Sequence, residues 1–351
     1  MLSILSGRLA VLTLGLVSSV FAFGQAAQSV EVPKQIRFVV GTGAGGGFDQ
    51  YARLVAKYIE TDFAEKPTVI IQNMPGAGGI RSLSWLASVA PKDGSTVATM
   101  SSSAVFAPLL GQRGATYDAK AFNYLISLDR LDNFLLVWHT TPFTSADEAF
   151  TKEIIIGNSS GPSAIMPMMY NRLLGTKFKV VKGYRGTNDT LLAIERGEAQ
   201  GAFNLSWSSI VSHPRLLPEK LVRVLLQLTF SPVDDPRLAN VPTLNKYVKD
   251  GPEKDMLEIL LAKDEMGRAI IAPQDVPPEI VREYRVRLQA IVESKKFVAE
   301  AQQRQMPLSI KSGDDADRYV KRMYSKPEAT IKRLREELAL ATNQIRKDKS
   351  E

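Results

Sequence analysis

A glycine-rich segment and the acidic residue that follows it have the first spacing in the chain with a chemical meaning. Residues 41–46 (GTGAGG) match G-x-G-x-x-G, which lets a pyrophosphate approach the backbone at a helix N-terminus in dinucleotide-binding enzymes. The next predicted strand, however, ends in Gln72 and Asn73 rather than in an acidic residue for the ribose, and Asp49 would repel a pyrophosphate. The segment therefore predicts an anion-binding turn without a nicotinamide or flavin, and we expect no cofactor.

A second motif has the spacing of a hydrolase nucleophile. Residues 157–161 (GNSSG) match G-x-S-x-G, with Ser159 in the nucleophile position. A catalytic triad also needs a histidine, and the sequence has only His139 and His213. Because His213 precedes a proline in a predicted connection, we favour a serine-rich helix N-terminus and expect no catalytic residue. An exported serine hydrolase that uses Ser159 is the alternative.

The composition excludes several other classes of site. The chain has no cysteine, 2 histidines and no spaced carboxylate cluster, so we expect no transition-metal site and no disulfide. The formal charge is +7, but acidic and basic residues are interspersed. No basic stripe with interleaved aromatic residues indicates nucleic-acid binding. The positive excess instead favours attraction of an anionic solute.

The N-terminus is typical of a secretory signal peptide. Arg8 precedes an apolar run over residues 9–23, and small residues follow at 24–27. This run is shorter than the roughly 20 residues that a transmembrane helix needs. We therefore expect residues 1–26 to be removed, with cleavage near residues 25–28, and the mature protein to be periplasmic.

Apolar strand-like runs alternate with glycine-rich turns and amphipathic segments along the chain. One series of strand–helix pairs covers residues 35–63 and 68–90, and a second covers residues 154–174 and 179–196. Repeated units of this kind predict parallel sheets covered by helices, which is the α/β fold class.

Two such series separated by an irregular segment predict two lobes. The C-terminal third is mainly helical and has too few strands for a sheet of its own, so we expect it to return to the first lobe. The first lobe then comprises residues 27–139 and 225–351, and the second lobe comprises residues 140–224. Crossings near residues 128–142 and 222–232 would form a two-stranded hinge.

The glycine-rich turns share one physical property. Each follows a strand and precedes a helix, so it places free backbone N–H groups and the positive end of a helix dipole at the carboxyl edge of a sheet. Tight-turn geometry alone accounts for any single turn. Four such turns in one exported chain favour a carboxylate clamp formed between two lobes.

Three segments resemble a known family. Residues 41–53 (GTGAGGGFDQYAR) resemble the PGGGxDxxAR segment of the tripartite tricarboxylate transporter receptors, also called the Bug family. Residues 72–79 (QNMPGAGG) resemble its ENRPGAGG turn, and residues 90–94 (APKDG) its APDGYT turn. The resemblance extends over about residues 35–310.

This resemblance implies a type II periplasmic binding protein fold, with two α/β lobes joined by a two-stranded hinge. The implied function is to capture a small carboxylate, without catalysis. The expected partners are inner-membrane subunits of a tripartite tricarboxylate transporter or a sensor, with no nucleic acid, and we expect a monomer.

The resemblance also implies a set of ligand contacts from turns of both lobes. In the first lobe these are Gly46, Gly47, Phe48, Asp49, Met74, Pro75, Gly76, Ala77 and Gly78; in the second they are Ser159, Ser160, Ser163, Tyr184 and Arg185. We place Ser101 and Ser102 at the cleft floor, and Asn204 where ligand-specific groups can lie.

Two charged residues in these turns need separate treatment. Met74 replaces the arginine of the family turn, and Arg81 either restores a cation there or lies on the helix surface. We expect Asp49 to be a helix N-terminal cap supported by Arg53 four residues later, because a carboxylate facing the ligand would repel an anion.

Overall fold

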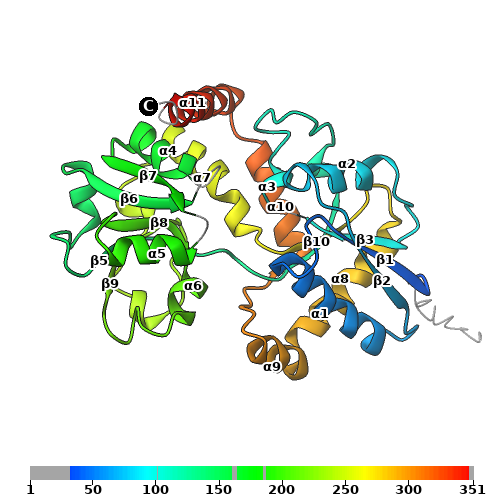
Figure 1. Cartoon of the computed structure of the whole chain (residues 1–351). Helices are drawn as coiled ribbons and strands as arrows, with labels where there is room; N and C mark the ends of the chain where they lie inside the picture. Colours follow the sequence, from blue (N-terminus) through cyan, green and yellow to red (C-terminus); the bar gives the residue numbers. More distant parts are fainter. Residues whose placement is uncertain (1–31, 101, 160–163, 185–186, 348–351) are drawn as a thin grey trace, which may run out of the picture. The chain divides into compact units, whose positions relative to one another are not determined.

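The computed structural model of the protein describes residues 32–100, 102–159, 164–184 and 187–347 (Figure 1). The described strands form two sheets with helices around them, which confirms the predicted α/β class. In the order of pairing, the first sheet contains β11 (Lys311–Ser312), β4 (Asn123–Ser127), β10 (Ala269–Ala272), β3 (Thr96–Thr99), β1 (Gln35–Val40) and β2 (Thr68–Asn73). The second contains β7 (Phe178–Tyr184), β6 (Ile154–Ser159), β8 (Gly201–Ser206), β5 (Asn133–Trp138) and β9 (Val222–Gln227).

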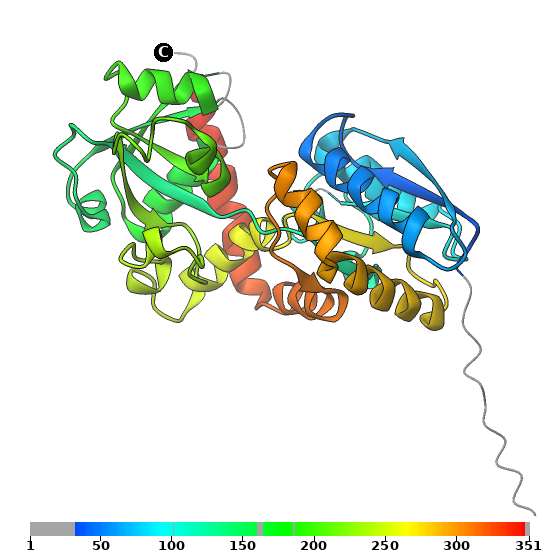
Figure 2. The same cartoon turned by 90° about the horizontal axis from the view of Figure 1, so that it is seen from below.

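The described helices include those that the sequence predicted after the glycine-rich turns and in the C-terminal third, where α7 is longer than the predicted segment at residues 257–261. Their bounds are α1 (Gly47–Asp62), α2 (Ile80–Ser88), α3 (Ser102–Val105), α4 (Ile165–Leu174), α5 (Thr187–Glu195), α6 (Trp207–Ser212), α7 (Pro252–Glu265), α8 (Pro278–Glu293), α9 (Lys295–Gln303), α10 (Gly313–Tyr324) and α11 (Glu328–Lys347). Figures 1 and 2 both show α11, in red, beside α4 and α7, and these helices are in contact.

Helices cover both faces of the first sheet. Alternate side chains of β1 point to opposite faces and therefore pack against different helices. Ile36 and Phe38 join an apolar cluster with α1 and α8, whereas Val39 joins a cluster with α2 and α10. The second sheet is built in the same way. Phe134 of β5 packs with α5 and α6, and Leu135 packs with α4. Sheets buried on both faces explain why the strands read as continuous apolar runs.

The strand pairing shows that the second lobe begins earlier and ends later in the sequence than we expected. β5 pairs with β8 and β9, so residues 133–138 belong to the second sheet, although the expected first lobe extended to residue 139. β9 also extends past the expected limit at residue 224. The first crossing therefore comprises residues 128–132, between β4 and β5.

The second crossing also lies later than expected. After β9 the chain stays against the second sheet, since Gln227 bridges Thr243 and Leu238 joins the cluster around Phe134. α7 then carries the chain back to β10 in the first sheet. The C-terminal third joins the first sheet only in part. β10 and β11 pair there, and the sequence analysis did not identify them because they have only four and two residues. α11, in contrast, packs against α4 of the second lobe, although the expected first lobe included residues 225–351.

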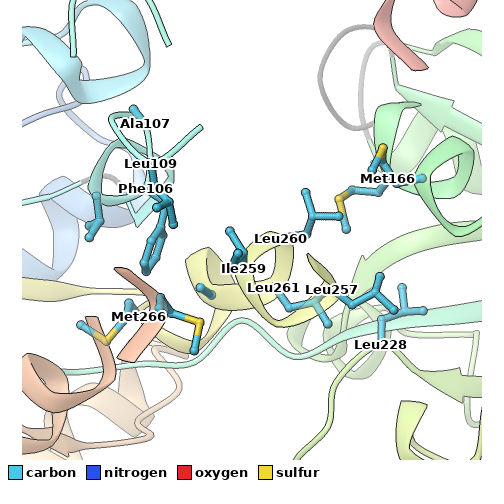
Figure 3. Close-up of a cluster of buried hydrophobic side chains, with 14 of the residues drawn as sticks. Phe106, Ala107, Leu109, Met166, Leu228, Leu257, Ile259, Leu260, Leu261 and Met266 are labelled. Atoms are coloured by element: carbon cyan, nitrogen blue, oxygen red, sulfur yellow. The ribbon is translucent and has the colours of Figure 1, made fainter. Parts of the chain in front are cut away.

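The return crossing is helix α7, whose apolar side joins a core shared by the two lobes. Leu257, Ile259, Leu260 and Leu261 of α7 share one buried cluster with residues of both lobes. Figure 3 shows Leu257 on the side of Leu228, and Ile259 on the side of Phe106. Within the ranges that the structure describes, no helix is both long and apolar enough to span a membrane.

Candidate functional site

The two glycine turns of the first lobe start side by side. β1 and β2 are parallel neighbours, and their last residues, Val40 and Asn73, are in register. The N–H of Met74 donates a hydrogen bond of 2.8 Å to the carbonyl of Val40. The strand register therefore brings the first turn (residues 41–46) and the second turn (residues 74–79) together at the carboxyl edge of the sheet, as the sequence predicted.

Asp49 joins these two turns. Its carboxylate accepts hydrogen bonds from the Gly45 N–H (2.8 Å), from the Arg53 Nε (2.8 Å) and from the Asn73 Nδ2 (2.9 Å). The same Asn73 amide also donates to the carbonyl of Thr42 (3.1 Å). The side chain of Asp49 is 2% exposed, so its negative charge is neutralised inside the turn and does not face a ligand.

The expected role of Asp49 was correct in its ion pair and wrong in its position. Arg53 forms the predicted pair four residues later, but the N-cap of α1 is Gly46 and Asp49 lies in the first helical turn. From there it reaches back to the N–H of Gly45, the residue before the N-cap. The hydrogen bonds from Arg53, Gly45 and Asn73 lower the pKa of Asp49 to about 2, so it is ionised at every physiological pH.

The second turn depends on unusual backbone conformations. Gly76, Ala77, Gly78 and Gly79 have consecutive positive φ angles of 148°, 46°, 64° and 99°. Such angles are easily adopted by glycine but strained for alanine. This path turns the chain from β2 into α2 and leaves residues 75–78 exposed. Their backbone groups are therefore accessible to a ligand.

The side chains of Met74 and Arg81 lie in different environments at the second turn. Met74 is buried in the core beside Leu83, so its side chain does not reach the exposed surface of the turn. Arg81 is exposed, and its Nη1 donates to the carbonyl of Pro75 at 3.4 Å. Its side-chain carbons lie 3.1–3.8 Å from the position of a Cβ on Gly76. Of the two interpretations of Arg81, the structure favours a cation next to the turn.

Arg268 is a neighbour of the first turn that the sequence analysis missed. It directly precedes β10, which pairs antiparallel with β3, so it lies at the same sheet edge as the ends of β1 and β3. Its guanidinium carbon is 4.3 Å from the centre of the Phe48 ring, and its Nη2 is 2.9 Å from where a Cβ on Gly47 would be. No local pattern indicates this contact, because it depends on the placement of a four-residue strand from the far end of the chain.

In the second lobe, Asn204 has two marks of a binding residue. It lies within β8 with a φ of 66°, a left-handed conformation that costs a non-glycine residue about 1 kcal/mol or more. Its Oδ1 is buried and has no hydrogen-bond partner in the part of the chain that the structure describes. Strain together with an unpaired buried acceptor favours the ligand-contact hypothesis over a purely structural role.

The remaining predicted contacts of the second lobe lie at or beyond the ends of strands. Tyr184 is the last residue of β7 rather than part of the following turn, and its hydroxyl donates to Glu198 at 3.5 Å. Ser159 is the last residue of β6. Several predicted positions lie outside the described residues, wholly or by their side chains: Ser101, Ser102, Ser159, Ser160, Ser163 and Arg185.

The geometry of the second sheet does not support the hydrolase alternative. His139 follows β5, and the N–H of Trp138 bonds to the carbonyl of Gln200, just before β8 begins. Since β6 runs parallel to β8, Ser159 lies at the opposite, carboxyl edge. His213 lines a surface pocket together with Trp138 and Leu221, which also lie at the amino edge. Neither histidine is placed to activate Ser159.

Comparison with known proteins gives consistent results. A family model described as "Tripartite tricarboxylate transporter family receptor" matches residues 51–335. A protein of Cupriavidus necator, "UPF0065 protein in gbd 5'region", is 25% identical over 284 residues, which cover 76% of this chain and 79% of the relative.

Two solved structures are similar to this chain at low sequence identity. A TctC solute-binding protein from Polaromonas, without ligand, is 18% identical with a TM-score of 0.67, covering 87% of this chain and 98% of the other. A protein of R. palustris with adipate is 22% identical with a TM-score of 0.55, covering 88% and 97%.

Two α/β lobes between which the chain crosses and returns, with exposed glycine turns at a sheet edge, define a solute-binding receptor of the periplasmic type. The family model that matches residues 51–335 identifies the family within this class. The chain belongs to the tripartite tricarboxylate transporter family of receptors.

Proposed function

We propose that this receptor binds a small organic carboxylate at the two glycine turns of the first lobe. The main support is the connection of these turns by Asp49 and Asn73, which fixes two sets of exposed backbone N–H groups next to each other. The start of α1 adds the positive end of a helix dipole. The adipate that is bound to the R. palustris relative is a ligand of this chemistry.

In the proposed mechanism, the second lobe closes over the bound carboxylate. Asn204 then offers a polar side chain from β8. Closure removes the ligand from bulk water, where charge-assisted hydrogen bonds are weakened. The receptor performs no catalysis and releases the ligand to inner-membrane subunits of a tripartite tricarboxylate transporter or to a sensor.

The test is a thermal-shift screen of the purified protein. The panel contains succinate, malate, adipate, citrate, benzoate, an amino acid and a nicotinamide nucleotide. A ligand present at about 100 times its Kd should stabilise the folded state by about 2.7 kcal/mol and raise the melting temperature. Shifts with carboxylates alone would support the proposal. A shift only with the nucleotide, or with no carboxylate of the panel, would contradict it.

We further propose export with removal of residues 1–26 and function as a monomer in the periplasm. N-terminal sequencing of the protein from a periplasmic fraction should find a mature start near residues 25–28. Light scattering of that material should give the mass of one chain. An intact N-terminus in the membrane fraction would contradict cleavage.

A further inference from the structure

Arg268 is a cation in a place where the protein gives it little compensation. Its Nη1 donates to the carbonyl of its neighbour Gly267 at 3.1 Å. Its Nε is buried without a hydrogen-bond partner among the described residues. No described carboxylate forms an ion pair with it, unlike Arg53, which pairs with Asp49. A guanidinium has five N–H donors, so most of its capacity is unused by the described residues.

The position of Arg268 makes the absence of an ion-pair partner more unfavourable electrostatically. Its Nη2 lies beside Gly47, the first residue of α1, where the free N–H groups already create a positive field. A cation at a helix N-terminus is electrostatically unfavourable. Asp49 does not relieve this, because its carboxylate is occupied by Gly45, Arg53 and Asn73.

Asp129 is the acidic group whose charge acts on Arg268. Burial raises the pKa of Asp129 to about 6, although the charge of Arg268 acts in the opposite direction. The two side chains do not form an ion pair among the described residues, and Asp129 lines a separate cavity at the first crossing with Trp207 and Pro307. Without an ion pair to Asp129, most N–H groups of the Arg268 guanidinium have no partner among the described residues.

Packing against two aromatic rings holds Arg268 in place without an ion pair. The guanidinium carbon lies 4.3 Å from the ring centre of Phe48 and 5.5 Å from that of Tyr51. The Tyr51 hydroxyl in turn donates to the carbonyl of Pro307, which fixes the ring. Two aromatic rings orient the planar group while its Nη2 is directed at the first glycine turn.

We propose that Arg268 binds a carboxylate of the ligand together with the backbone N–H groups at the start of α1. A Cβ on Gly47 would lie 2.9 Å from the Nη2 atom, so a larger residue there would shift the guanidinium. The inference rests on the proposed carboxylate receptor and adds to it the side chain that makes the site selective for anions over neutral analogues.

The experiment measures ligand binding by calorimetry with matched arginine variants. The probe is whichever of succinate, malate, adipate, citrate and benzoate gives the largest thermal shift, together with its neutral amide. We expect Arg268→Gln to weaken binding of the acid by about 10- to 100-fold, the effect of losing a charge-assisted hydrogen bond. The amide should lose much less, and Arg268→Lys should retain part of the affinity for the acid.

Arg237→Gln is the control. Arg237 also stacks on an aromatic ring, at 5.0 Å from the centre of Trp207, but it pairs with Asp235 at 2.5 Å. This variant should bind the acid like the wild type. Equal losses for acid and amide in Arg268→Gln, or no loss in that variant while the wild type binds, would overturn the inference. A wild type that binds no acid of the panel would instead contradict the proposed function.

A double-mutant cycle separates direct binding from a general effect on α1. Gly47→Ala places a methyl group against Nη2 and should weaken the acid. Added to Arg268→Gln, the same change should cost little more, because both act on one contact. Fully additive losses would show that Gly47 does not act through Arg268 and would overturn that part of the inference. Denaturant unfolding of each variant checks that the fold is intact.

Discussion

The two glycine turns of the first lobe have similar compositions but are held in their conformations by different means. In the first turn, side chains from outside fix the backbone: Asp49 binds Gly45, and Asn73 binds Thr42. In the second turn, the conformation depends on the backbone of residues 76–79, which have four consecutive positive φ angles.

The difference shows that glycine serves two purposes in one site. At Gly47 it leaves room for Arg268, and at Gly41 it leaves room for Ser82, whose Oγ is 2.6 Å from the position of a Cβ. At Gly76 and Gly78 it permits angles that other residues resist. The first turn should therefore be sensitive to its partners, and the second to its own sequence.

The largest effect should come from removing the charge that holds the first turn. All three groups that bind the Asp49 carboxylate are donors, so in Asp49→Asn the new NH2 group must face one of them. We expect a loss of about 2–3 kcal/mol in the free energy of unfolding, measured with urea, together with loss of ligand binding.

Asp250→Asn is the control for this change, because Asp250 also pairs with a cation four residues later but is 94% exposed. It should leave the free energy of unfolding almost unchanged, because an exposed ion pair contributes little. Similar small effects in both variants would mean that Asp49 does not hold the turn. The pH dependence has a defined sign: because the folded-state pKa of Asp49 is lowered to about 2 from 3.8, its contribution is present above pH 3.8 and is lost as the pH falls towards 2.

A smaller loss is expected from a methyl group in the second turn. Gly76 has a φ of 148°, so Gly76→Ala should cost about 1–3 kcal/mol in backbone strain and weaken carboxylate binding by reorienting the turn. Gly43→Ala in the first turn should be tolerated, because Gly43 is not in the left-handed region and a Cβ there has no neighbour within 4 Å. Equal tolerance at the two positions, measured by thermal unfolding and calorimetry, would remove the distinction between the turns.

The smallest effect has the opposite sign. Ala77 has a φ of 46°, so Ala77→Gly should relieve more strain than it adds in chain entropy and stabilise the protein by about 0.5 kcal/mol. Ala44→Gly in the first turn relieves no such strain and should destabilise the protein slightly. A loss of stability in Ala77→Gly would indicate that this alanine makes a contact worth more than its strain.

Local features of the site were predictable from sequence, and contacts between distant segments were not. The helix after the first turn was predictable because Tyr51, Leu54 and Val55 repeat with helical spacing, and all three are buried. The Asp49–Arg53 pair was predictable for the same reason. The bond from Asn73 to Asp49 depends on the register of β1 and β2, and the approach of Arg268 depends on β10, which has too few residues to give a periodic signal.

The lobe limits were missed for a related reason. β5 and β9 are apolar runs that fit either sheet, and only their pairing with β8 and with each other assigns them to the second. The apolar side of α7 likewise gave no indication of which lobe it would pack against, because it packs against both.

The position of α7 has a consequence for how this protein unfolds. A receptor joined by two flexible linkers would melt as two independent domains, each with its own transition. Here Leu257 and Ile259 share one apolar cluster with Met166 and Phe106, so disorder in either lobe exposes side chains that stabilise the other. Calorimetry should therefore record a single cooperative transition, and neither lobe expressed alone should reach the stability that it has in the intact chain.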